Sequence, residues 1–156
     1  AALEKVTSRY ELADIFSGME RDYRPDLPVL NREAVRLYER LLGLEGDTFG
    51  MSLAQKTAAL GLADILRPAS PGAQLTRERA AALLARLYAG LNGLGGESVA
   101  ASKKTAVGDE AAIDGAFREA VGLCLEKGFL KLAGGRFEPA RALTRGELIA
   151  ALAQML

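Results

Sequence analysis

The chain has 156 residues, of which 49% are hydrophobic and 26% are charged, the composition of an ordinary folded globular protein. Its 20 basic and 20 acidic side chains cancel, which argues against a global positive field that would draw it onto nucleic acid or acidic lipid. No apolar run approaches the roughly 18 residues of a membrane-spanning helix, so membrane insertion is not expected.

Helical periodicity recurs along the chain in pairs of segments. The first member of each pair is expected at residues 8–19, 52–66 and 111–127, and Gly128 marks the end of the last one. The second members begin at Asn31, Thr76 and Thr144. From Thr76 the apolar residues recur at helical spacing as far as Gly93, and from Asn31 they do so as far as Gly43.

This pattern predicts an all-α fold built from three helix-turn-helix repeats that share one core. The repeats are placed at residues 1–46, 47–93 and 109–156. Residues 94–108 have no helical or strand period and are expected to form a linker. Two short extended pieces around Gly134 and Gly135 are expected to pair as a small hairpin.

Each second helix is preceded by a similar start signal. Leu75-Thr76-Arg77 and Leu143-Thr144-Arg145 both follow a turn rich in proline, glycine or alanine, with proline at the same offset. Threonine is a good helix N-cap, and Glu147, three residues after Thr144, completes a capping box. Looser copies are Leu30-Asn31-Arg32, with asparagine in the cap position, and Thr7-Ser8-Arg9, in which Arg9 precedes Arg77 by the same interval that separates Arg77 from Arg145.

The order of motifs in the third unit resembles a repeat of the S-layer homology (SLH) family. It runs through Lys127-Gly128-Phe129, then Gly135-Arg136-Phe137-Glu138-Pro139, then Thr144-Arg145-Gly146-Glu147. The second unit resembles the family through its proline turn and Leu75-Thr76-Arg77, and the first does so loosely. The usual Phe-x-Asp entry and the tryptophan before the first helix are missing from all three units.

The resemblance implies three repeats packed about a pseudo-threefold axis with a central helical bundle. It also implies a role: non-covalent anchoring of a bacterial surface protein to an acidic secondary cell-wall polysaccharide, often pyruvylated, and hence an extracellular, cell-surface location. Several weak sites joined in one chain would anchor by avidity on a repeating polymer.

The residues themselves suggest how an acidic glycan would be held. A helix N-terminus leaves N–H groups unpaired and carries a partial positive charge, and a guanidinium meets a carboxylate with two parallel hydrogen bonds. An arginine next to the threonine cap would add its charge to those open N–H groups. The predicted polysaccharide-binding residues are therefore Arg77, Arg145, Thr76, Thr144, Arg32, Asn31 and Arg9.

Other interpretations of the same residues stay open. The arginines can pair with acidic residues of a neighbouring repeat and hold the repeats in register, and the threonines can be plain caps. The domain as a whole can be a degenerate repeat module for protein interaction or spacing. An enzyme is not expected, because the chain has no histidine, Cys124 lies in an apolar helical stretch, and no metal-ligand cluster appears. No cofactor or metal is expected, and the three repeats can complete their own core as a monomer.

Overall fold

The computed structural model describes residues 2–8, 10, 12–16, 23–66, 70–94 and 101–156. Its α-helices are α1 (Ala2–Thr7), α2 (Asn31–Leu41), α3 (Leu53–Ala59), α4 (Arg77–Leu91), α5 (Arg118–Lys127) and α6 (Arg145–Met155). Two 3-10 turns, η1 (Glu110–Ala112) and η2 (Gly115–Phe117), precede α5. The all-α fold predicted from the periodicity is confirmed. Within the described residues, no helix combines the length and the hydropathy needed to cross a bilayer.

The three second helices begin around a ring of backbone hydrogen bonds. The Val29 N–H donates to the Leu143 carbonyl, the Leu143 N–H to the Leu75 carbonyl, and the Leu75 N–H to the Val29 carbonyl, each at 2.8 Å. All three side chains are fully buried. One residue of each repeat thus pairs with both of the others, which gives the helix starts a pseudo-threefold arrangement.

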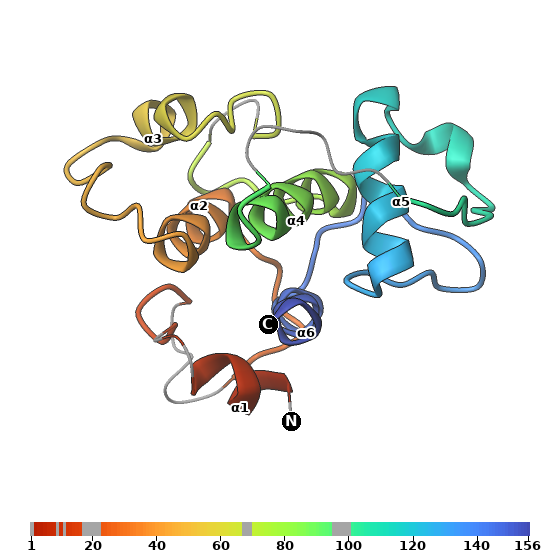
Figure 1. Cartoon of the computed structure of the whole chain (residues 1–156), viewed down its shortest axis with the longest axis horizontal. Helices are drawn as coiled ribbons and strands as arrows, with labels where there is room; N and C mark the ends of the chain where they lie inside the picture. Colours follow the sequence, from red (N-terminus) through yellow and green to blue (C-terminus); the bar gives the residue numbers. More distant parts are fainter. Residues whose placement is uncertain (1, 9, 11, 17–22, 67–69, 95–100) are drawn as a thin grey trace.

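Each first helix packs on the second helix of a different repeat. Helix α1 packs against α6, α3 contacts α2, and α5 packs against α4. Figure 1 shows α1 beneath α6 at one side of the molecule and α5 crossing the end of α4. Lys5 ties the ends of the described chain together, because its Nζ donates to the Ala153 carbonyl at 2.6 Å. The repeats therefore close into a ring in which no repeat is packed only on itself.

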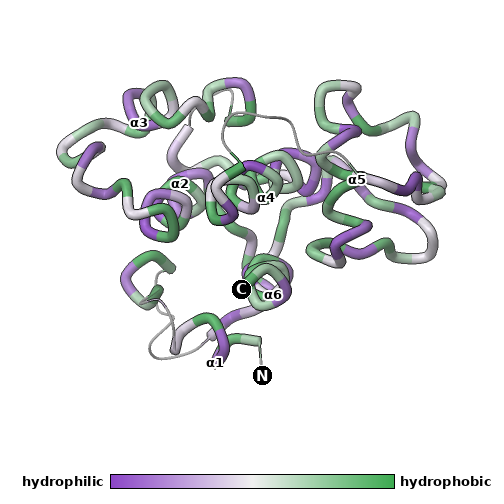
Figure 2. The backbone as a smooth tube through the Cα atoms, in the orientation of Figure 1, coloured by the Kyte–Doolittle hydropathy of each residue, from purple (hydrophilic) through white to green (hydrophobic). Residues whose placement is uncertain are grey.

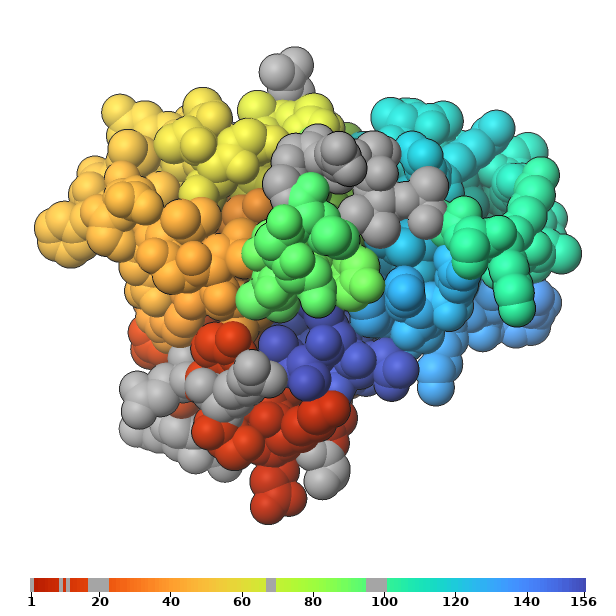
Figure 3. All heavy atoms as spheres, viewed as in Figure 1, coloured from red at the N-terminus to blue at the C-terminus, as the bar shows by residue number. Residues whose placement is uncertain are grey.

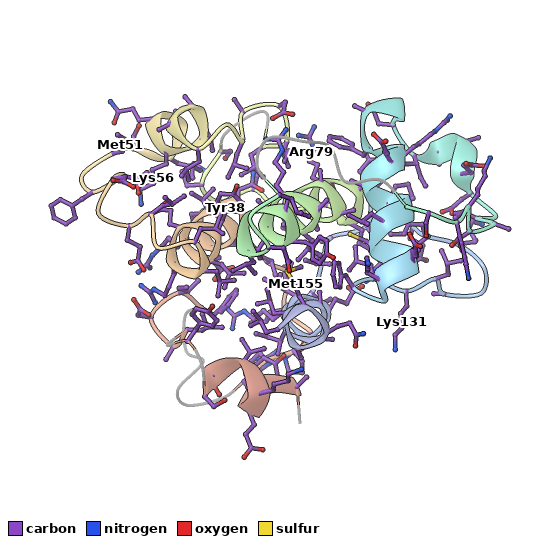
Figure 4. The ribbon with its side chains drawn as sticks, in the orientation of Figure 1. Tyr38, Met51, Lys56, Arg79, Lys131 and Met155 are labelled. Carbon is purple, nitrogen blue, oxygen red and sulfur yellow. The ribbon has the colours of Figure 1, made fainter. Side chains whose placement is uncertain are left out.

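The core lies between the second helices and receives apolar side chains from all of them. Figure 2 shows apolar residues along α2, α4 and α6, and Figure 4 places Met155 of α6 between α6 and α4. Cys124 of α5 is fully buried, its Sγ lies 3.4 Å from the Ala81 carbonyl, and burial raises the pKa of the thiol to about 12. Cys124, which the sequence places in an apolar helical stretch, is thus part of the core. The most deeply buried apolar side chains of the three helices are Ala34, Val35, Leu37, Ala80, Ala81, Leu84, Leu148, Ile149, Ala151 and Leu152.

The first helices are shorter than the periodicity predicted. The helix expected at 52–66 ends at Ala59, because Gly61 has a φ of +70° and residues 62–66 form a turn. The helix expected at 8–19 lies earlier, at Ala2–Thr7, and residues 13–16 again form a turn. The helix expected at 111–127 is broken before Arg118, where Asp114 caps η2 by accepting a hydrogen bond from the Ala116 N–H at 2.9 Å. Gly128 ends α5 at a φ of +73°, as predicted.

The small hairpin of the third repeat is present as a single bridge. Ala133 and Arg136 exchange backbone hydrogen bonds of 2.9 and 3.0 Å around Gly134 and Gly135. Two residues further on, Glu138 has a φ of +57°, a left-handed conformation that is strained for a side chain of this kind.

The carboxylate of Asp109 holds this segment in place. It accepts hydrogen bonds from the Phe137 N–H at 2.7 Å and from the Glu138 N–H at 2.9 Å. Both bonds lower the pKa of Asp109 below its usual value of about 3.8, and the bond from Phe137 has the larger effect. Asp109 thereby fixes the backbone of residues 137 and 138.

We predict that these bonds of Asp109 make stability depend on pH in the acid range. A carboxyl whose pKa is depressed by folding contributes stability above its unfolded pKa, and that contribution is lost as the pH falls through the folded pKa. An Asp109→Asn variant should therefore have a lower free energy of unfolding than the parent at pH 7. This difference between the two proteins should disappear below about pH 4. Urea unfolding of both proteins at several pH values measures this; a difference that does not change with pH would contradict the assignment.

Candidate functional site at the helix starts

The N-termini of α2, α4 and α6 are covered by backbone from a neighbouring repeat. The first helical N–H groups, those of Asn31, Arg77 and Arg145, donate to carbonyls of residues 73, 141 and 27 at 2.8 to 2.9 Å. The next N–H groups donate to the carbonyls of three prolines, Pro71, Pro139 and Pro25, at 3.0 to 3.4 Å. The expectation that these N–H groups lie open to an anion is wrong, because each proline turn occupies the helix start of another repeat.

Arg77 is buried at the corner between α4 and α6. Only 2% of its side chain is exposed, and its guanidinium forms an ion pair with Glu147. The same group donates to the Phe137 carbonyl at 2.8 Å and to the Lys131 carbonyl at 2.7 Å, and it lies 4.7 Å from the centre of the Phe137 ring. Burial is the main cause that lowers the pKa of Arg77, and the positive charge of Arg141 lowers it further. All three of its nitrogens are engaged by partners from the third repeat.

Arg145 occupies the same position at the corner between α6 and α2. It is 5% exposed, its guanidinium lies 3.6 Å from Glu33 Oε2, and it stands 5.5 Å from the centre of the Phe16 ring. Glu33 also accepts a hydrogen bond from the Leu30 N–H at 2.8 Å. At both corners, the first residue of one helix is therefore paired with the third residue of the next.

The third corner, between α2 and α4, lacks this pair. The equivalent positions hold Asn31, whose side chain donates to the Ser70 carbonyl at 3.3 Å, and Arg79. Arg79 donates to the Ile65 carbonyl and lies 5.7 Å from the centre of the Phe117 ring. Figure 4 shows Arg79 near the start of α4. Two corners of the ring thus hold an ion pair, and the third holds an asparagine and an arginine that do not pair with each other.

This arrangement corrects the alignment of the first repeat. Asn31 is the first residue of α2 and matches Arg77 and Arg145, whereas the cap position belongs to Leu30. Arg32 is one residue further on and is exposed. The structure therefore brings Arg77, Arg145 and Asn31 to equivalent corners and leaves Arg32 outside them. Arg9 lies outside the described residues.

The two threonines differ in what their side chains do. Thr144 forms the predicted capping box, since its Oγ1 accepts from the Glu147 N–H at 3.2 Å and Glu147 accepts from the Thr144 N–H at 3.2 Å. Thr76 stands in the cap position without a side-chain capping bond, and its Oγ1 is buried with no partner in the described part of the chain. Arg79 stands at the third helical position of α4, so the reciprocal half of a capping box, in which a glutamate side chain accepts from the cap N–H, is also absent.

A second repeated signal was missed in the sequence. Leu-Ala-Asp-Ile occurs at residues 12–15 and again at 62–65. Asp14 pairs with Arg40 of α2, and Asp64 pairs with Arg86 at the matching position of α4. The hydrogen bond from Arg40 keeps the pKa of Asp14 below its usual value. These exposed pairs fasten each post-helix turn to the second helix of its own repeat.

Two hollows lie away from the helix starts. One, of about 720 Å³, opens beside Tyr10, Asp14 and Arg40. The other, of about 230 Å³, lies between α5 and the segment before it. Among the described residues, no group of three or more histidine, cysteine or acidic side chains is placed to hold a metal ion.

Comparison with known proteins gives a structural likeness only. No protein-family model matches the chain, and no curated protein matches it. Among solved structures, it is similar to an undecaheme cytochrome from the S-layer of Carboxydothermus ferrireducens, at a TM-score of 0.51 and 18% sequence identity. The match covers 99% of this chain and 20% of the cytochrome chain, so this chain spans about a fifth of that protein. At this identity the likeness shows the fold.

We predict that Arg77 acts mainly in stability. Arg77→Ala removes the buried partner of Glu147, which keeps its ion pair with Arg141, and leaves two carbonyls without their donor, so it should lower the free energy of unfolding by about 2 to 4 kcal/mol. Arg32→Ala, at an exposed position beside a helix start, is the matched control and should change it by no more than about 0.5 kcal/mol. Chemical denaturation measures both. Equal effects of the two variants would contradict the assignment.

The two threonines give a second paired prediction. Thr144→Val removes a capping bond and should cost about 1 kcal/mol. Thr76→Val removes a buried hydroxyl that has no described partner, so it should be neutral or stabilising. Thermal unfolding monitored by circular dichroism compares the variants under one condition. A loss at Thr76 as large as that at Thr144 would show that both hydroxyls cap.

Proposed function

We propose that this chain is an SLH-type repeat domain of a bacterial surface layer, and that it acts as a protein-interaction and spacer module. In this proposal the arginines at the helix starts are fasteners between repeats. The observation that carries it is the burial of Arg77 and Arg145 in ion pairs with Glu147 and Glu33 of neighbouring repeats. A glycan carboxylate would have to displace an internal carboxylate from each of them.

The energetics favour the internal partner. Each buried guanidinium is held by a carboxylate of a neighbouring repeat, that of Glu33 buried and that of Glu147 partly exposed. Separating such a pair costs free energy before any ligand binds. The helix N–H groups that would support a bound anion already donate to backbone carbonyls of the next repeat. The missing tryptophan and Phe-x-Asp elements of the SLH pattern agree with a module that has kept the packing of the family without its ligand site.

The surface location rests on two observations. The sequence resembles SLH repeats in its third unit, and the fold resembles part of a cytochrome described as coming from an S-layer. The fold match spans nearly the whole of this chain but a fifth of that protein, which fits a module carried within larger surface proteins. Anchoring to an acidic cell-wall polysaccharide is the competing proposal.

Co-sedimentation with cell-wall sacculi separates the two proposals. The purified chain should pellet equally, and weakly, with sacculi that carry their polysaccharide and with sacculi from which it has been removed. Pelleting that requires the polysaccharide would overturn the proposal. In that case two variants would locate the binding site: Arg145→Gln changes a buried corner residue, and Arg32→Gln changes an exposed one. Melting temperatures recorded for both variants would separate loss of binding from loss of stability.

A further inference from the structure

One aromatic side chain stands apart from the rest of the molecule. Phe49 is 90% exposed and lies in the connection between the first and second repeats, which forms the left end of the molecule in Figures 1 and 3. Met51, labelled in Figure 4, is 37% exposed beside it. Removing a ring of this size from water is favourable, yet Phe49 adds nothing to the core. Folding does not account for its presence.

A buried polar network stabilises the turn that carries Phe49. Thr48 is 1% exposed, and its Oγ1 lies 2.8 Å from Glu39 Oε2 and 3.2 Å from the Leu44 carbonyl. Glu39 is 3% exposed and pairs with Lys56 at 3.0 Å. The backbone of a turn that is already ordered loses little further freedom on binding. The exposed side chain of Phe49, called the knob below, is therefore presented to solvent on an ordered turn.

The hollow of about 230 Å³ beside α5 is large enough for that ring. A cavity of roughly 150 Å³ with apolar walls holds a benzene molecule. The exposed wall of this hollow is mainly apolar, and Gly122 of α5 is one of its lining residues. A Cβ added to Gly122 would meet Ala101 at 3.6 Å, an ordinary van der Waals distance. The apolar residues that line it are Val107, Ile113, Val121 and Leu125, together with Gly122.

The connection that carries Phe49 lies at one end of the long axis of the molecule, and α5 with the segment before it, whose residues line the hollow, lies toward the other end (Figure 1). Contact between two different surfaces of one chain is heterologous, so it extends into a ring or an open row of copies. Asp47 is exposed next to the knob, and Lys104 and Arg118 are exposed at the hollow. Glu110 and Glu119 also stand there, so the fit rests on apolar contact more than on charge.

We propose that Phe49 of one copy inserts into the hollow beside α5 of a second copy, and that copies associate head to tail. This inference rests on the proposed function, because it names the partner of the interaction module as another copy of the same chain. A row of modules joined end to end is the kind of contact from which a surface layer is built.

Two single variants test the contact from its two sides. Phe49→Ala removes the knob, and Gly122→Leu fills the hollow with a residue that favours helix more than glycine does. Sedimentation velocity of the parent chain, from micromolar to millimolar concentration, should show a mass that rises beyond that of a dimer. Each variant alone should associate at least about tenfold more weakly, as loss of a central anchor residue does.

Mixing the variants gives the decisive result. Phe49→Ala keeps its hollow and Gly122→Leu keeps its knob, so an equimolar mixture should form a dimer that grows no further. Gly122→Ala, which leaves most of the hollow open, should associate like the parent. A parent chain that stays monomeric, a Phe49→Ala variant that associates as the parent does, or a mixture that stays monomeric would each overturn the proposal. Polysaccharide-dependent pelleting would overturn the proposed function without altering these masses.

Discussion

The structure depends on one cyclic set of backbone hydrogen bonds. Residues 29, 75 and 143 pair with one another around the pseudo-threefold axis, and the turn before each helix caps the helix of another repeat. Buried N–H groups that lack a partner are costly, so no repeat can satisfy its own helix start alone. This constraint closes the ring and places the first residue of each second helix at an inter-repeat corner.

Those corners explain why the arginines are buried. A side chain that begins a helix covered by another repeat points into the interface, where a charge requires an internal partner. Glu147 and Glu33 provide it from the third position of the next helix, and the two guanidinium groups lie over the rings of Phe137 and Phe16. The features expected to attract an acidic glycan are thereby used inside the protein, which favours a structural role for them.

The departure from threefold symmetry falls at a single corner. Asn31 and Arg79 stand where the other corners have arginine and glutamate, and Thr76 forms no side-chain capping bond there. The surface is equally uneven, since the connection after α2 presents Phe49 while a hollow lies beside α5. Three repeats with a similar sequence pattern thus share one core and differ in their outer surfaces. Different surfaces at the two ends are what the proposed interaction module requires.

The sequence by itself determined the helical class, the three second helices, the Thr144 cap and the stop at Gly128, because these follow from local periodicity and from the backbone freedom of single residues. It did not determine the pairing of first helices with other repeats, the register of Asn31, or the burial of the arginines. Only the tertiary structure decided these, since a helix start looks the same in sequence whether solvent or a neighbouring proline turn covers it. For the same reason the sequence could not distinguish the exposed Phe49 from the phenylalanines of the core. The exposure of a side chain depends on what packs around it, and sequence spacing does not show that.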